Sequence, residues 1–202
     1  DTTITAIELN NLDTATTGTI NATSVNILTG DATAVKTALA SSGITTVTNN
    51  SLAVNVSGST SVADINTINS DSATGIVTAT ATETAAATLI GLTTTDTDAI
   101  TVTMAAASTA AADLNTIDGK TSVAVNAAAV TTLTGTAAQV QASYTANTAG
   151  TITGLGNEAV TISDTTITAV ALNNLDTATT GTINATSVTS LTGTAADIKL
   201  AL

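Results

Sequence analysis

The feature that most constrains the fold is an internal repeat. Residues 164–202 repeat residues 1–39, and adding 163 to each number of the first stretch aligns it with the second at 30 identical positions of 39. Weaker copies of the same pattern lie between these two. Self-similarity of this kind is the sequence signature of repeat proteins, in which each repeat buries its apolar side only against its neighbours. The sequence therefore predicts a repeat architecture.

Each copy of the pattern contains one helix-like segment. The segment begins with a hydroxyl or acidic residue suited to an N-cap and continues with Ala and aliphatic residues at helical spacing. Thr5 with Glu8, and Ser61 with Asp64, have the spacing of capping boxes, although Asp is a poorer partner than Glu. We predict short helices here, which would be marginal in isolation and need packing against neighbours.

One central aliphatic residue marks each of these segments. Successive markers lie 24 to 32 residues apart, with a mean of 27. A period of about 20–30 residues is typical of one coil of a solenoid. We expect all eight markers to be buried at equivalent places and to form the repeat core: Leu9, Val35, Ile65, Leu89, Leu114, Val140, Leu172 and Ile198.

Strand-like runs separate the helix-like segments. In these runs β-branched residues alternate with small or polar ones, and glycines punctuate the runs at expected turns. The runs cover residues 19–28, 53–57, 76–82, 99–104, 123–130, 159–163 and 182–191.

The expected fold class is a β-rich repeat solenoid with short helices. It would have about eight coils of about 27 residues, with strands stacked in parallel. An all-β solenoid, in which the Ala-rich segments are loops or single turns, is the alternative. Residues 1–202 are expected to form one such segment of a longer repetitive chain.

Composition excludes several classes of function. The formal net charge is −12 with only three lysines, which disfavours nucleic acid as a partner. An apolar run long enough to insert into a membrane is absent from the sequence. The chain lacks His and Cys and shows no phosphate-binding glycine motif, so we predict neither an enzyme nor a cofactor.

One acidic pair is a weak candidate for a metal site. Asp96 and Asp98 are two residues apart, and alternate residues of a strand share a face, so the pair could bind Ca²⁺. The sequence favours a solvated acidic turn over this hypothesis, because the glycine-rich nonapeptide pattern of calcium-binding β-rolls is absent.

Pairs of Thr separated by one residue raise a second hypothesis. Flat, regular Thr arrays suit ice binding, and such pairs occur at 78 and 80, at 101 and 103, and at 151 and 153. They do not recur at one fixed place in the repeat, and Thr is also common in ordinary strands. Ice binding is therefore an alternative.

Two stretches resemble known repeats. TAAADLNTIDG (109–119) resembles the TAAELNxLDG repeats of phage tail-fibre and related fibrous proteins. Residues 172–197, together with TITGLGNEAVT (151–161), are similar to Thr/Ala-rich tandem repeats of very large exported bacterial surface proteins, including those of marine cyanobacteria. This resemblance implies an extracellular or cell-surface location and a structural or adhesive role, without catalytic residues.

The predicted function is that of a structural repeat protein. Because the stretches at 1–39 and 164–202 are nearly identical, a surface that one offers to its neighbour should be offered by the other too. Copies could then stack head to tail and contribute to an extracellular filament, a surface layer or a giant adhesin. A ligand-binding adhesin module and an ice-binding protein are the alternatives.

Overall fold

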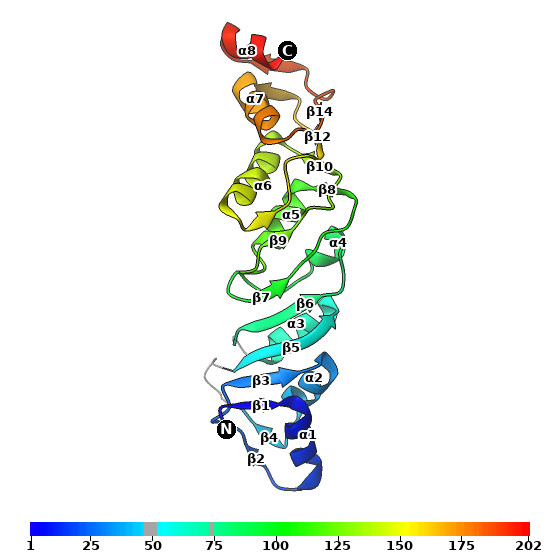
Figure 1. Cartoon of the computed structure of the whole chain (residues 1–202), viewed down its shortest axis with the longest axis vertical. Helices are drawn as coiled ribbons and strands as arrows, with labels where there is room; N and C mark the ends of the chain where they lie inside the picture. Colours follow the sequence, from blue (N-terminus) through cyan, green and yellow to red (C-terminus); the bar gives the residue numbers. More distant parts are fainter. Residues whose placement is uncertain (47–51, 73–74) are drawn as a thin grey trace. The chain divides into compact units, whose positions relative to one another are not determined.

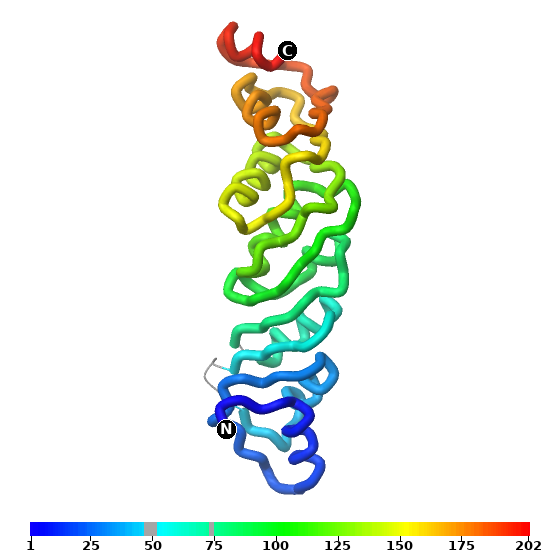
Figure 2. The backbone as a smooth tube through the Cα atoms, viewed as in Figure 1, coloured from blue at the N-terminus to red at the C-terminus, as the bar shows by residue number. Residues whose placement is uncertain are grey.

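The computed structural model describes residues 1–46, 52–72 and 75–202, and these residues form two compact units. The first unit comprises residues 1–84, 91–102 and 120–123, and the second comprises residues 85–90, 103–119 and 124–202. Figure 1 labels the helices and most of the strands of both units, and Figure 2 traces the path of the backbone through each. Each unit has its own sheets and its own core.

The first unit is built on a five-stranded parallel sheet in the order β1-β3-β5-β6-β7, with a separate parallel pair, β2-β4. Helices α1, α2 and α3 lie in the crossovers between successive strands of the larger sheet, since parallel strands cannot be joined by a tight turn. The elements are β1 (Thr3–Thr5), α1 (Ala6–Ala15), β2 (Ile20–Asn21), β3 (Ile27–Gly30), α2 (Ala32–Ala40), β4 (Ile44–Thr45), β5 (Ala53–Thr60), α3 (Val62–Asp71), β6 (Val77–Ala81) and β7 (Ala99–Thr101).

The second unit repeats this plan with smaller sheets. A four-stranded parallel sheet has the order β14-β12-β10-β8, and β11-β9 and β13-β15 form two parallel pairs. Its elements are α4 (Ala86–Leu89), β8 (Ser108–Ala110), α5 (Ala111–Asp118), β9 (Val125–Asn126), β10 (Thr132–Gly135), α6 (Ala137–Ala149), β11 (Ile152–Thr153), β12 (Ala159–Ile162), β13 (Thr166–Thr168), α7 (Ala169–Ala178), β14 (Ile183–Asn184), β15 (Ser190–Thr192) and α8 (Ala195–Ala201).

Side-chain caps fix where most of the helices begin. At six N-caps the side-chain oxygen accepts a hydrogen bond from the backbone N–H three residues later, which satisfies one of the free donors of the first turn. Thr5 forms a complete capping box with Glu8, whereas Ser61 receives no return bond from the shorter Asp64. The six capping residues are Thr5, Asp31, Ser61, Thr136, Thr168 and Thr194.

The cores consist of aliphatic side chains aligned by the strand register. In the first unit Leu28 lies opposite Val54, which lies opposite Val77, and all three are buried. In the second unit Leu133 and Val160 form the same kind of column. Side chains on alternate residues point toward the helices, and the small size of Ala on the helices lets the two layers pack closely.

The predicted β-rich solenoid of about eight coils is wrong, and so is the all-β alternative. The chain is an α/β protein with parallel sheets, and the eight helices of the described residues cover more of the chain than the strands do. The strands are divided among five separate sheets, which are not stacked into a solenoid. The repeats instead form Rossmann-like β–α units, and the mean interval of 27 residues is the spacing of these units.

Asparagine side chains explain why the predicted long strands are short. In the run 182–191, the Asn184 side chain accepts a hydrogen bond from the Thr186 backbone N–H, which closes a turn and ends β14. Asn21 and Asn126 end β2 and β9 in the same way, through Thr23 and Ala128. Such turns compete with sheet hydrogen bonds, so the predicted runs 19–28, 123–130 and 182–191 do not form single strands. The predicted runs 53–57, 76–82 and 159–163 each lie mainly in one continuous strand, β5, β6 or β12.

Candidate functional site

All eight marker residues occupy the same helical position, the fourth residue after the N-cap. The six markers from Leu9 to Val140 are buried. The two markers of the last stretch, Leu172 and Ile198, are partly exposed. We call residues 1–39 the first copy and residues 164–202 the second copy, because the difference between them recurs at other positions.

Two leucines show the difference between the copies most clearly. In the first copy Leu9 is 2% exposed and Leu12 is 51% exposed, whereas in the second copy Leu175, the equivalent of Leu12, is fully buried. Helix α1 packs on α2, which follows it, while α7 packs on both α6 and α8. The same sequence therefore has one side covered by a preceding helix in the second copy and uncovered in the first.

The uncovered side of the first copy forms an open hollow of about 550 Å³. We call it the first-copy face. It is lined by apolar and acidic or amide side chains of β1 and α1: Asp1, Thr3, Ile4, Glu8, Asn11 and Leu12.

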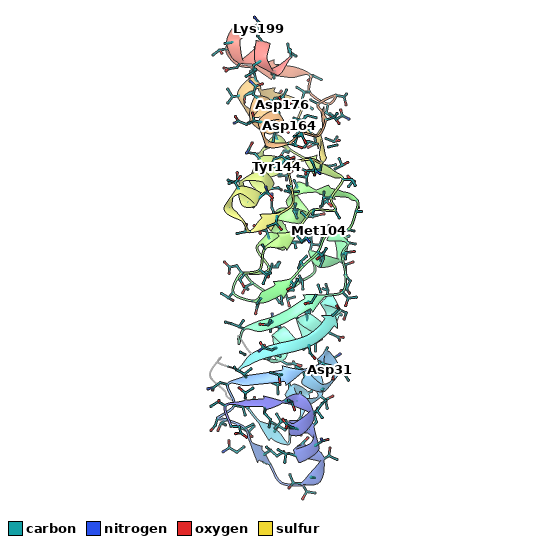
Figure 3. The ribbon with its side chains drawn as sticks, viewed as in Figure 1. Asp31, Met104, Tyr144, Asp164, Asp176 and Lys199 are labelled. Atoms are coloured by element: carbon teal, nitrogen blue, oxygen red, sulfur yellow. The ribbon has the colours of Figure 1, made fainter. Side chains whose placement is uncertain are left out.

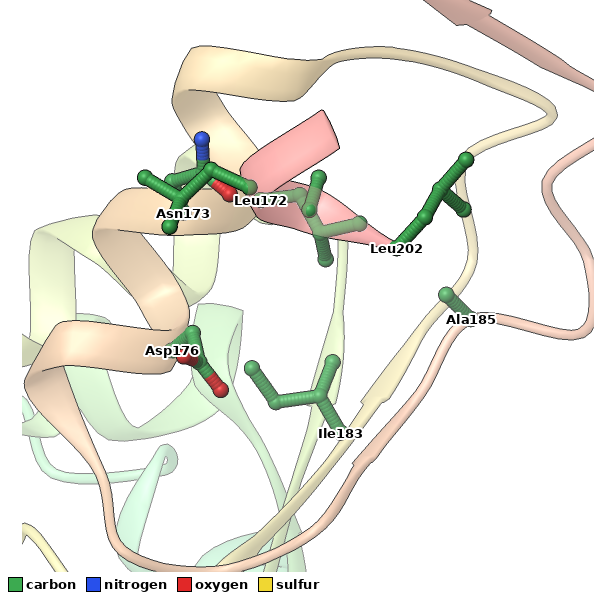
Figure 4. A pocket seen from close by; sticks show the side chains of 8 residues that line it. Leu172, Asn173, Asp176, Ile183, Ala185 and Leu202 are labelled. Carbon is green, nitrogen blue, oxygen red and sulfur yellow. The ribbon is translucent and has the colours of Figure 1, made fainter. Parts of the chain in front are cut away.

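The second copy has an open hollow of about 430 Å³, and none of its lining residues is equivalent to a residue of the first-copy face. We call it the second-copy face, and Figure 4 shows its side chains around α7, α8 and β14. It is lined by Leu172, Asn173, Asp176, Ile183, Ala185, Leu200, Ala201 and Leu202. In the first copy the residue equivalent to Ala185, Ala22, is buried.

Equivalent strands of the two copies, β2 and β14, also form their hydrogen-bonded ladders on opposite edges. Both copies contain Thr-Ile-Asn before the Asn turn. In the first copy this strand, β2, pairs with the following β4, whereas in the second copy the equivalent β14 pairs with the preceding β12. Each copy thus leaves the other edge of the strand without a ladder among the described residues.

Neighbouring helices contact each other through a recurrent pair of positions. The fifth residue after one N-cap lies beside the third residue after the next N-cap. The Asn115 side chain donates to the Gln139 carbonyl at 3.0 Å, from α5 to α6. The equivalent bonds run from Asn10 to the Ala34 carbonyl, 3.0 Å, and from Asn173 to the Asp197 carbonyl, 3.1 Å.

The contact from α2 to α3 uses the same two positions with charged side chains. Lys36, the fifth residue after its N-cap, forms an ion pair with Asp64, the third residue after its own. The hydrogen bond from Lys36 lowers the pKa of the Asp64 carboxyl below its usual value. About a third of each side chain is exposed, so the pair orients the helices more than it stabilises them.

A buried tyrosine and a buried glutamate form a polar contact in the second unit. The Tyr144 hydroxyl donates to Glu158, whose other carboxylate oxygen accepts from the backbone N–H groups of Gly156 and Asn157 at 2.8 and 3.1 Å. Burial, followed by the hydrogen bond to Glu158, raises the pKa of the Tyr144 hydroxyl well above its usual value. The Tyr144 hydroxyl, the Glu158 carboxylate and the two backbone N–H groups form hydrogen bonds with one another, so the cluster has a structural role.

The glycines beside this cluster have a spacing that the sequence prediction overlooked. Residues 154–159, GLGNEA, match the G-x-G-x-x-A spacing of dinucleotide-binding turns. In those turns the glycines open a helix whose N-terminus binds the phosphates. Here the segment leads into strand β12, so the geometry that phosphate binding requires is missing.

The structure places the two candidate metal ligands differently. Asp96 is exposed in a turn, while Asp98 is buried. The Asp98 carboxylate accepts hydrogen bonds from the backbone N–H groups of Val77 and Thr95, both at 2.9 Å. Among the described residues, no group of three or more acidic, His or Cys side chains could hold a metal ion. Asp98 therefore joins neighbouring segments of the first unit.

The Thr pairs do not form a regular grid. Thr80 lies beside Thr101, but Thr78 lies beside Asn55 on one strand and Ala99 on the other. In the second unit Thr153 lies beside Asn126. Of these residues, Thr80 and Thr101 lie beside each other, while Thr78 and Thr153 lie beside other residue types.

Comparison with known proteins identifies no relative. No family model matches the chain, and no curated protein or solved structure shows significant similarity to it. Over the described ranges 1–46, 52–72 and 75–202, no helix has both the length and the apolar character needed to cross a membrane.

Proposed function

We propose that this chain is a structural repeat protein whose molecules associate through the first-copy face of one and the second-copy face of another. The observation that carries this proposal is the opposite burial of Leu12 and Leu175, which are equivalent residues in nearly identical stretches. One face is uncovered in the first copy and covered in the second.

The packing of α6 on α7 in the second unit shows how such a contact between two molecules could be formed. Leu175 of α7 is fully buried, and α7 packs on α6 as well as on α8. Helix α8 resembles α6, since each begins at the first Ala of the same Thr-Gly-Thr-Ala-Ala sequence, at 134–138 and 192–196. Helix α8 of one molecule could therefore pack on α1 of another as α6 packs on α7, and would then cover Leu12.

The energetics make such an assembly dependent on concentration. Fully burying one Leu side chain stabilises a contact by about 1.5–3 kcal/mol. Association costs about 4–15 kcal/mol in lost freedom of motion, so one leucine cannot hold two molecules together. Several apolar side chains of both faces must be buried together, among them Ile4, Leu12, Leu172, Leu200 and Leu202.

When the first-copy face of one molecule binds the second-copy face of another, the resulting pair still has binding faces that are free. Each bound molecule still presents one free face of each kind, so head-to-tail contacts propagate into rings or open filaments. This behaviour supports a role in an extracellular filament, surface layer or adhesin. The resemblance to Thr/Ala-rich repeats of exported bacterial surface proteins supports the extracellular location.

Sedimentation velocity and electron microscopy of the 202-residue chain, from micromolar to millimolar concentration, test this proposal. We expect elongated or ring-shaped oligomers that grow with concentration. Leu12→Asp should abolish them, because a carboxylate would have to be buried in the contact. Ile76→Asp is the matched control, since Ile76 is also 51% exposed but lines neither face. A chain that stays monomeric at millimolar concentration would refute the proposal.

A further inference from the structure

Four of the helix contacts follow one positional rule, whereas Asn66, the fifth residue after Ser61, instead donates to the Gly91 carbonyl. The fifth residue after an N-cap lies beside the third residue after the next N-cap, as the Asn115 and Lys36 contacts show. The contact from α6 to α7 obeys the rule too, because Gln141 and Ala171 occupy these positions and line the same hollow.

Glu8 of the first-copy face and Lys199, which precedes Leu200 of the second-copy face on α8, carry opposite charges at these positions. Lys199 is the fifth residue after the N-cap of α8, and Glu8 is the third after the N-cap of α1. Both side chains are exposed, and Figure 3 labels Lys199 near the end of the chain. Glu8 uses one carboxylate oxygen, Oε2, for its bonds to Thr5. Its other oxygen has no hydrogen-bond partner among the described residues.

The sequence differences between the copies concentrate charge at this place. Glu8 is replaced by Ala171 in the second copy, and Lys199 stands where α6 has Gln141. The covered contact between α6 and α7 is therefore neutral at the two positions. The charged combination occurs in the contact from α2 to α3, where Lys36 meets Asp64.

We propose that Lys199 of one molecule pairs with Glu8 of a second copy of this chain and sets the register of their contact. The inference rests on the proposed association of the two faces and adds the interaction that selects the correct partner. A partly exposed pair contributes little affinity, but wrong pairings of like charge are disfavoured, so such pairs give specificity. Each molecule carries a net charge of −12, so the molecules repel one another in general. A contact that brings Lys199 to Glu8 places opposite charges together and is therefore favoured over other orientations.

Charge reversal on each face tests the pair. Lys199→Glu places two acids together in every contact between identical molecules, and Glu8→Lys places two lysines together. We expect each variant alone to associate roughly tenfold more weakly than the parent chain. An equimolar mixture of the two should recover the parent affinity, because each contact then joins Lys to Glu, and the two variants must alternate. Sedimentation measures the affinity, and energy transfer between differently labelled variants measures the alternation.

Control variants distinguish the effect of the Lys199–Glu8 ion pair from effects of net charge and of folding. Lys120→Glu and Asp71→Lys make the same changes in net charge away from both faces and should leave association unchanged. Glu8→Ala restores the residue found at 171, which tests loss of the pair without repulsion. Far-UV circular dichroism checks that each variant is folded.

Each outcome is decisive. If the parent chain associates and the mixture fails to recover, or the single variants associate like the parent, the ion pair is refuted while the association of the faces stands. If the parent chain remains monomeric, the proposed function itself is refuted. Weak single variants with a recovered, alternating mixture support the pair.

Discussion

Gly181 lies against the backbone of Glu158 so closely that a Cβ atom at position 181 would overlap the Glu158 carbonyl. At Gly18, the equivalent residue of the first copy, an added Cβ would meet nothing nearer than the Thr16 hydroxyl at 3.4 Å. The contrast arises because β14 pairs with a preceding strand and β2 does not.

Alanine at these two glycines should therefore have opposite effects. Gly181→Ala is expected to destabilise the second unit by about 1–3 kcal/mol, since the backbone must move to admit the methyl group. Gly18→Ala should be neutral or stabilise by up to about 1 kcal/mol, because Ala restricts the unfolded chain. Urea unfolding of both variants measures the difference, and equal effects would contradict the structure.

The leucines of the two copies should differ in the same sense. Leu175→Ala removes a fully buried side chain and is expected to cost about 2–5 kcal/mol of unfolding free energy. Leu12→Ala removes a side chain that is 51% exposed and should change stability by about 0.5 kcal/mol or less in dilute solution. A large loss for Leu12→Ala in the monomer would show that α1 is covered.

Alkaline pH should weaken the second unit through Tyr144. Its pKa is raised in the folded state, so the stabilisation it provides is complete below its unfolded pKa of about 10. Above that pH the unfolded chain loses the hydroxyl proton while the folded chain keeps it, and stability falls by about 1.4 kcal/mol per pH unit. Urea unfolding between pH 8 and 11 should show this fall, and Tyr144→Phe should remove it.

Calcium should not affect stability. The Asp98 carboxylate is engaged by the Val77 and Thr95 backbone groups, and Asp96 is exposed to solvent. A ligand that binds only the folded state would raise the melting temperature by mass action. We expect the same melting temperature in EDTA and in millimolar Ca²⁺, whereas Asp98→Ala should lower it in both. A rise with Ca²⁺ that Asp98→Ala abolishes would restore the metal hypothesis.

Local signals in the sequence located most of the helix starts, but α4 and α5 begin after Ala85 and Ala110, which form no side-chain cap. Thr5 and Ser61 were recognisable as N-caps because the cap, its partner and the first aliphatic residue all lie within four residues. The placement of every marker at the fourth residue after an N-cap follows from the same local pattern. The exposure of Leu172 could not be read this way, since the LNNLD sequence that it begins is the same as the one that begins at the buried Leu9.

The sheets could not be predicted because they depend on partners far apart in the chain. The run 182–191 alternates like one strand, yet the hydrogen bond from Thr186 to Asn184 divides it between two sheets. Glu158 was likewise overlooked, because the burial of its carboxylate is visible only when Tyr144 is placed beside it. Both features follow from tertiary contacts that composition and periodicity do not encode.

Tyr144 has one more consequence, since it is the single aromatic residue of the chain. Light absorbed or emitted near 280–310 nm, the usual range for tyrosine, reports on one position in the second unit, and the first unit is optically silent there. Tyrosine emission will therefore follow the release of that hydroxyl from Glu158, while far-UV dichroism follows the helices of both units. If the two signals change at different urea concentrations, the units unfold independently, and a natural chromophore will have distinguished them without any label.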